Sequence, residues 1–354
     1  MTGLLAPEGL AVEPSERQAG LQLTDRRRRV LGLLAALAVL LLGCTLSLVL
    51  GSQMLPLDET LTALVRDNGM AHTIVVEQRI PRTVLAVLVG IALAVAGALM
   101  QGLTRNPLAD PGLLGVSAGA SFAMLVAVML DPGAGRLTLV GASFVGAVVT
   151  TVVVYMIGAA GRRGSSPVTL VLAGVAIGAV LSGITATLEL LSARLLLSGR
   201  TFAAGSLENR GWETVLMVAP CLVVGLLLAA LAARGLNAFA LGEDLAAALG
   251  ANQWVTRTAV VVAVTVLCGS ATAAIGLVWF VGLMVPHVAR WLTGPDQRWV
   301  LAYSCVLGPA LMVAADVVGR VVVIPDEIPA GLVTAFVGAP VLVWMVRRHG
   351  ASAL

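Results

Sequence analysis

The chain has 354 residues, of which 58% are hydrophobic and only 12% are charged, so it has too little polar surface for a water-soluble globular protein. All 22 basic residues are arginine, which excludes chemistry that depends on lysine, such as ATP hydrolysis at a P-loop or a Schiff base. The apolar residues form repeated runs of about 20, the length that crosses a hydrocarbon core roughly 30 Å thick. Because these runs are continuous and do not alternate with polar residues, they favour helices over a barrel. The fold class predicted is therefore all-α, a polytopic membrane protein.

The N-terminus has two parts. Residues 1–25 are polar and rich in Glu, Pro, Gly and Gln, and we expect them to form a disordered cytosolic tail. A block of four arginines at 26–29 then precedes the first apolar run, 30–50. This order also resembles a signal peptide, and LLGC at 41–44 resembles a lipoprotein cleavage box. The run continues past Cys44 to spanning length, which favours an uncleaved first span.

Ten spans are predicted in a membrane domain at 26–348, which is followed by a short tail at 349–354. Spans two and three belong to the stretch 79–120. The later spans are expected near 137–157, 168–191, 215–233, 257–270, 274–292, 299–319 and 331–346.

The arginines indicate the orientation. With the block at 26–29 inside and an even number of spans, both termini are cytosolic. This topology places fourteen of the 22 arginines on the cytosolic side, in agreement with the positive-inside rule.

Small residues recur at four-residue steps in three spans, which places them on one helix face. They are Gly90, Ala94, Ala98 and Gly102 in span two, Gly174, Gly178, Ser182 and Ala186 in span five, and Gly331, Ala335 and Ala339 in span ten. Such stripes let helix backbones approach closely, so helix packing is the first interpretation. A subunit interface or the wall of a transport pathway is the alternative.

No span carries an ionisable residue near its centre, which argues against a proton-coupled carrier that works alone. No catalytic motif of a membrane enzyme is present either. The three histidines are far apart and the four cysteines are isolated in apolar runs, so no metal site is predicted. Energy for transport would then come from a partner. The cytosolic segment 241–254 (LGEDLAAALGANQW) is the candidate for docking it, as a short amphipathic helix with Gly250 at its C-cap, although an ordinary surface helix has the same pattern.

Several segments, in order along most of the chain, resemble the permeases of iron-siderophore and vitamin B12 ABC importers. They include RIPRTVLAVLVG, MQGLTRNPLADPGLLGVSAGASF, LGEDLAAALG, GLVWFVGLMVPHVARWLTGPDQRW, ADVVGR and EIPAGLVTAFVGAPV. Within the family, LTRNPLADPGLLGV, VLCGSATAAIG and FVGLMVPHVARWL look closest to the D-type subunits of ferric enterobactin importers.

The resemblance implies a permease subunit in a bacterial cytoplasmic (inner) membrane that is not an enzyme. It implies a second, related but non-identical permease chain, two ATP-binding subunits that use the ATP, and an extracytoplasmic binding protein that delivers a ferric siderophore. No cofactor bound by this chain and no nucleic-acid partner are expected. Haem or cobalamin is the alternative cargo within the family, and a stand-alone proton-coupled carrier is less favoured.

The family's motifs also carry residue roles onto this sequence. Arg79, Arg82 and Arg320 are expected on the outer surface, where they would meet glutamates of the binding protein; anchoring of helix ends to lipid headgroups is the alternative. The residues expected to couple to the ATPase are Leu241, Gly242, Glu243, Asp244, Ala247, Leu249 and Gly250. The residues expected to support a gate or hinge at inner span ends are Asn106, Pro107, Asp110, Pro111, Pro286 and His287. For His287 we expect a local hydrogen bond.

Overall fold

A computed structural model describes the backbone of residues 16–52, 55–67, 69–159, 167–240, 242–248, 250 and 252–349, and this described part is helical with no strand. Of the predicted tail at 1–25, residues 1–15 lie outside the described residues. Helix α1 begins at Glu16, within the remainder of that tail. The predicted tail at 349–354 lies outside them except for His349, the last residue of α14.

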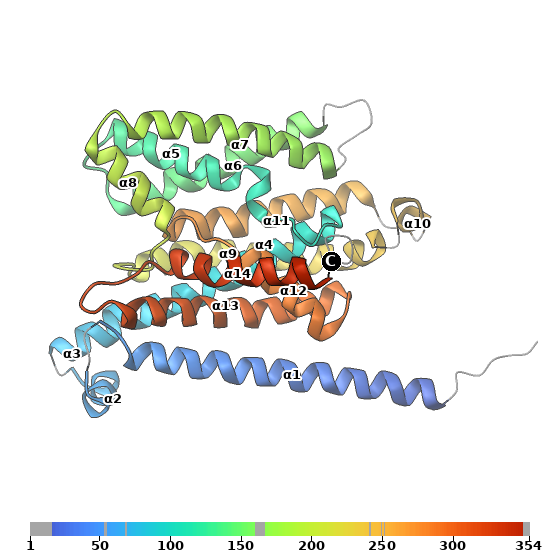
Figure 1. Ribbon diagram of the computed structural model, residues 1–354, viewed down its shortest axis with the longest axis horizontal. Coiled ribbons are helices and arrows are strands. Elements are labelled where there is room, and N and C mark those ends of the chain that lie inside the picture. Colours follow the sequence, from blue (N-terminus) through green and yellow to red (C-terminus); the bar gives the residue numbers. More distant parts are fainter. Residues whose placement is uncertain are drawn as a thin grey trace, which may run out of the picture.

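In the described part of the chain, ten helices of 13 or more residues run side by side along the long axis (Figure 1). They are α1 (Glu16–Val49), α4 (Ile80–Thr104), α5 (Val116–Leu130), α6 (Arg136–Ala159), α7 (Pro167–Glu189), α9 (Trp212–Phe239), α11 (Gln253–Ile275), α12 (Val281–Thr293), α13 (Gln297–Val322) and α14 (Ala330–His349). Within the described residues, seven of these regions are long and apolar enough to cross a membrane, and α5 and α14 contain shorter apolar helices. The chain is a multi-pass membrane protein.

Shorter elements close the two ends of the bundle. They are α2 (Leu57–Val65), α3 (Met70–His72), the π-helix η1 (Thr73–Arg79), the 3-10 helix η2 (Pro111–Leu114), α8 (Ala193–Ala204) and α10 (Glu243–Ala248). Helices α2, α3 and α8 lie at one end of the bundle, which we call the α2 end, and α10 lies at the other, the α10 end (Figure 1). The C-terminal end of α14 points toward the α10 end.

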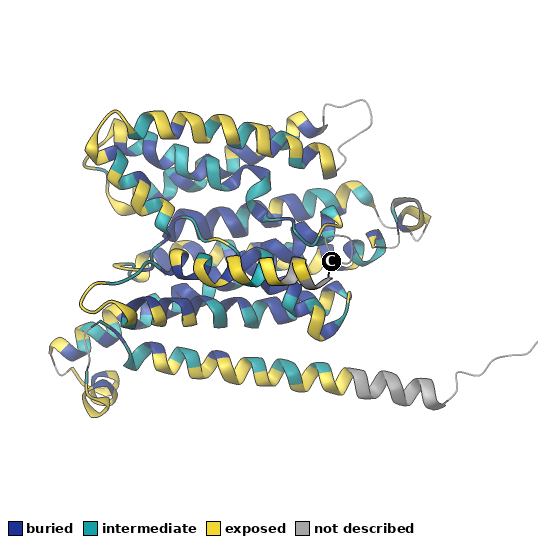
Figure 2. Cartoon of the chain, viewed as in Figure 1, coloured by how far each residue is buried: buried dark blue, intermediate teal, exposed yellow. Residues whose placement is uncertain are grey.

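The core of the bundle is built on α4 and α11, which are dark along most of their length in Figure 2. Helix α4 contacts α9, α11, α12 and α13, so it is surrounded by protein. By contrast, α1 and α7 expose many leucine and valine side chains, as expected for helices at the lipid-facing or subunit-facing rim. Helix α1 packs mainly on α13, where the Tyr303 hydroxyl donates to the backbone oxygen of Arg29 (2.6 Å).

Close packing of α4 depends on its small residues. A side chain at Gly90 would collide with the backbone of Gly308 and Pro309 in α13, and one at Gly97 would collide with the backbone of Gly282 in α12. The stripe that begins at Gly90 therefore faces α13, and Ala98 in the same stripe accepts a hydrogen bond from the Gln297 side chain (2.8 Å). Glycine lets the two backbones approach within van der Waals contact.

The predicted limits of three spans are wrong. Span three, α5, continues to Leu130, beyond the stretch 79–120. Span seven, α11, continues to Ile275, and span eight, α12, begins at Val281 and not near residue 274. The break between α11 and α12 comes from positive φ angles at Gly276 (87°) and Phe280 (66°), which no helix accommodates.

Candidate functional site

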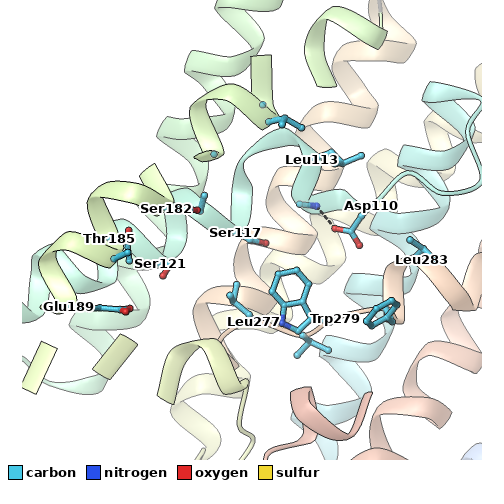
Figure 3. Close-up of a pocket in the computed structure, with 18 residues that line it drawn as sticks. Asp110, Leu113, Ser117, Ser121, Ser182, Thr185, Glu189, Leu277, Trp279 and Leu283 are labelled. Carbon is cyan, nitrogen blue, oxygen red and sulfur yellow. Dashed lines mark hydrogen bonds between the residues drawn. The ribbon is translucent and has the colours of Figure 1, made fainter. Parts of the chain in front are cut away.

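A cavity of about 540 Å³ runs along one face of α7 (Figure 3). Its α7 wall includes Gly174, Gly178, Ser182, Thr185, Ala186 and Glu189, which follow one face of the helix. At a rise of 1.5 Å per residue, the fifteen steps from the first to the last cover about 22 Å, which is most of the hydrocarbon thickness. The small-residue stripe predicted in span five thus lines an elongated cavity.

The opposite wall comes from η2, from the start of α5 and from the break between α11 and α12. Asp110, Ser117 and Ser121 line the cavity from this side, and Trp279 lies near Ser117 in the view of Figure 3. The Asp110 carboxylate caps η2, since its Oδ1 accepts from the backbone N–H of Gly112 (2.8 Å). Asp110 therefore holds the backbone that forms the wall.

The lining of this cavity suits passage of a ligand more than catalysis. Hydroxyl groups from both walls can donate to or accept from a polar ligand without fixing a charge. Asp110 and Glu189 are acidic, and among the described residues no basic side chain lines the cavity. Part of the α7 stripe also serves packing, because a side chain at Gly174 would collide with the backbone oxygen of Leu113 in η2.

The three arginines predicted to dock a partner lie together at the α2 end, where they form a buried cluster. Arg82 binds Asp316 through two hydrogen bonds to Oδ1 (Nη2, 2.8 Å; Nε, 3.0 Å), and its Nη1 contacts Glu327 Oε2 at 2.7 Å. Arg320 contacts the other Asp316 oxygen at 2.7 Å. We call Arg79, Arg82, Asp316, Arg320 and Glu327 the arginine cluster; a small cavity of about 80 Å³ borders four of them.

The arginine cluster also caps the C-terminal end of α1. Arg79 donates to the backbone oxygens of Leu48 (2.8 Å) and Val49 (2.9 Å), and Arg320 donates to those of Ser47 (3.0 Å) and Leu50 (3.2 Å). The last carbonyls of a helix have no partner within it and carry partial negative charge, so guanidinium groups are suited to them.

The expectation that these arginines are exposed is wrong. Arg79 and Arg320 are 5% and 2% exposed, because their donors are used inside the protein. Arg82, at 13%, and Glu327, at 16%, have the more exposed side chains of the cluster. A role of Arg79, Arg82 and Arg320 in docking stays a prediction. Sequence reasoning did not pair Asp316 and Glu327 with the arginines; the i,i+4 spacing of Asp316 and Arg320 was the one signal available.

The predicted gate residues lie in two groups. Asn106 orders the turn after α4, since its Oδ1 accepts from the Leu108 backbone N–H (2.9 Å), and Pro107 precedes Asp110 and Pro111 on the way into η2. Pro286 and His287 are buried inside α12, where the His287 ring stacks edge-on against Trp291 at 4.6 Å. Asp110 belongs to the cavity along α7, and Pro111 lies against Gly282 of α12, which joins the two groups.

The predicted coupling segment is α10 with its flanks. Leu241 and Leu249 lie outside the described residues, while Glu243 and Asp244 begin α10. Gly242 and Gly250 flank the helix with positive φ angles (108° and 81°), and the Gly250 N–H donates to the Ala247 oxygen (2.9 Å). Ala247 and Gly250 are exposed, so α10 presents a surface at its end of the bundle.

Residues 39–348 of the chain match the FecCD transport family. The chain belongs to this family. Among FecCD relatives, the ferric enterobactin transport system permease protein of Escherichia coli (strain K12) is 45% identical over 90% of this chain and 96% of its own. The iron(3+)-hydroxamate import system permease protein of Bacillus subtilis (strain 168) is 37% identical over 90% of this chain and 84% of its own.

A solved structure described as an inward-facing conformation of a metal-chelate type ABC transporter has the same fold. It superimposes with a TM-score of 0.80 at 26% identity and covers 89% of this chain and 98% of the other. The residues that match the FecCD family include the core helices α4 and α11 and also α7, which lines the cavity.

Proposed function

We propose that this chain is the membrane-spanning permease subunit of an ABC importer that moves ferric siderophores into a bacterial cell across its cytoplasmic membrane. The observation that carries the proposal is the match with the ferric enterobactin permease, which covers nearly all of both chains at 45% identity. The chain itself has no catalytic role in this proposal, and it binds no cofactor.

The topology that goes with this function has ten crossings. Helices α5, α12 and α14 cross in addition to the seven longer regions, which makes the number even. The α10 end then faces the cytosol together with both termini, and the α2 end faces outward. The excess of arginine on the α10 side under this orientation follows the positive-inside rule.

The cavity along α7 is the proposed half of the transport pathway. A second permease chain, related to this one but not identical, would close it from the exposed side of α7. Its hydroxyl and apolar lining would hold a chelate weakly, as transport requires. Asp110 and Pro111 at its inner part would support the gate through η2.

Two ATP-binding subunits and an extracytoplasmic binding protein complete the proposed importer. The exposed α10 would dock an ATPase subunit, so that ATP hydrolysis moves the inner ends of the helices. The binding protein would dock at the α2 end near Arg82, where its carboxylates would compete with Glu327 for the guanidinium.

The experiment that tests this function is ATP-dependent uptake of a ferric siderophore by the importer reconstituted in liposomes. We expect uptake that requires all subunits, and loss of both uptake and ATPase co-purification on Gly250→Trp combined with Glu243→Arg. Gly141→Ala, at an open position in α6, is the matched control and should change neither. Uptake by this chain alone, driven by a proton gradient, would refute the proposal.

A further inference from the structure

A second large cavity, of about 490 Å³, lies at the α2 end between α5, α6, α8 and the segment that joins α8 to α9. Arg136, at the start of α6, and Arg210, just before α9, both line it. No family motif quoted above includes either arginine, and the proposed transport mechanism uses neither.

The two arginines are not neutralised within the described part of the protein. Arg136 donates through Nη1 to the backbone oxygen of Asn209, which carries no charge. The Nε of Arg210 is fully buried and has no hydrogen-bond partner among the described residues. Burial and the neighbouring Arg136 lower the pKa of Arg210 to about 10, so the Arg210 guanidinium is still charged at neutral pH.

One carboxylate, Glu208, lies at the rim of this cavity, but it does not pair with either arginine. Its Oε1 accepts from the Asn209 side chain (3.2 Å), and the side chain is exposed. A buried N–H without an acceptor, such as the Nε of Arg210, is costly, and guanidinium groups bind oxygen anions through paired, charge-assisted hydrogen bonds. The pair therefore favours an anionic ligand with several oxygen atoms.

The other residues that line the cavity limit the chemical class of the ligand further. Phe202 and apolar side chains such as Met124 and Val128 form most of the wall, and Ser198 and Thr201 add hydroxyls. The cavity has the size and the mixed apolar and polar lining of small-molecule sites. An anion that also carries aromatic or apolar surface fits this wall better than a small inorganic ion does.

The position of the cavity connects it with the proposed pathway. The backbone oxygen of Phe202 accepts from the Leu277 N–H (2.9 Å), and Leu277 lines the cavity along α7. One hydrogen bond thus links the walls of the two cavities. Their charges differ, since the cavity along α7 has only acidic ionisable residues in its described lining.

We propose that the cavity around Arg136 and Arg210 is an outer receiving site that selects anionic, aromatic ferric chelates over neutral ones. A ferric tris-catecholate carries three negative charges, because three dianionic ligands surround Fe³⁺. A ferric tris-hydroxamate is neutral. Only the former would compensate both arginines, and the acidic cavity beyond would then bind it weakly and let it move on. This inference rests on the proposed function.

The test measures equilibrium binding of both chelates to the full-length chain in nanodiscs. We expect wild-type protein to bind the ferric tris-catecholate at least tenfold more tightly than the tris-hydroxamate. Arg210→Gln and Arg136→Gln should each weaken catecholate binding roughly tenfold or more, with little effect on the hydroxamate. Arg210→Lys should restore part of the affinity. Arg136 begins α6 with an exposed side chain, so its variant should fold even if Arg210→Gln does not.

Arg200→Gln is the matched control, since Arg200 lies on α8 but is exposed and does not line the cavity; it should change binding less than twofold. Equal affinity for the two chelates, or unchanged catecholate binding in the Arg136 and Arg210 variants, would overturn the inference. So would loss of a co-purified phospholipid from these variants with catecholate binding unchanged, because the site would then hold a lipid phosphate. Iron uptake by the complete wild-type importer is measured separately. If the wild-type importer takes up no iron, the proposed function is wrong; if it takes up iron but the binding results fail, only this inference is wrong.

Discussion

Asp316 is the carboxylate on which the arginine cluster depends. It lies between Arg82 and Arg320, contacts both at 2.7–2.8 Å, and is almost completely buried. Asp316→Asn keeps the shape of the side chain and removes the charge, which leaves two buried guanidinium groups facing each other. Removing one member of a buried ion pair costs about 3–5 kcal/mol.

For Asp316→Asn the structure indicates a loss of stability at the lower end of that range. Arg82 keeps its contact with Glu327, and Arg320 keeps the backbone oxygens at the end of α1. We therefore expect Asp316→Asn to lower the free energy of unfolding by about 3 kcal/mol. Denaturant titration of the purified chain in detergent, followed by circular dichroism, measures this value.

The matched control for this prediction is Asp131→Asn. Asp131 is exposed, and its Oδ1 accepts a single backbone hydrogen bond from Gly133 (2.9 Å), so a change within about 0.5 kcal/mol is expected. If Asp316→Asn is as mild as the control, the arginine cluster does not stabilise the fold and the reasoning fails.

Three further predictions follow from packing, from the cavity along α7 and from α10. Gly97→Ala should destabilise the chain by about 1–3 kcal/mol, because α4 and α12 must separate; thermal unfolding checks this against Gly141→Ala. Ser182→Trp should block uptake by filling the cavity without lowering stability, whereas Gly141→Ala, at the open position in α6, should leave uptake intact. Gly250→Val should weaken ATPase co-purification, since a β-branched residue disfavours a φ of 81°; unchanged co-purification would count against the coupling role.

The fold was largely predictable because apolar length and polar breaks determine where helices cross a membrane. The expected spans at 137–157 and 168–191 differ by only one or two residues from α6 and α7, since the segment GRRGSSP separates them clearly. The break between α11 and α12 was predicted too early, between residues 270 and 274, because residues 274–280 are as apolar as the helices around them. Backbone angles, and not composition, end α11 there.

The candidate site was predictable in residue type but not in pairing. The arginines of RIPR and ADVVGR were expected at one end of the molecule, and they lie there. Their burial against Asp316 and Glu327 depends on contacts between α4 and α13, more than 230 residues apart, which no local pattern reveals. No sequence pattern singled out Arg210, because its proposed role depends on the residues that line the cavity around it.

The capping of α1 has a consequence for how the chain assembles. Helix α1 precedes α13 in the chain, yet one of the two arginines that satisfy its last carbonyls, Arg320, follows Ser47 by 273 residues. Its main packing surface, α13, is equally late. The capping of α1 is therefore complete only once α13 is in place, although Arg79 can supply its part earlier. Truncation before α13 would remove the Arg320 hydrogen bonds and the main packing surface of α1, and would leave it the Arg79 hydrogen bonds and its contacts with α4.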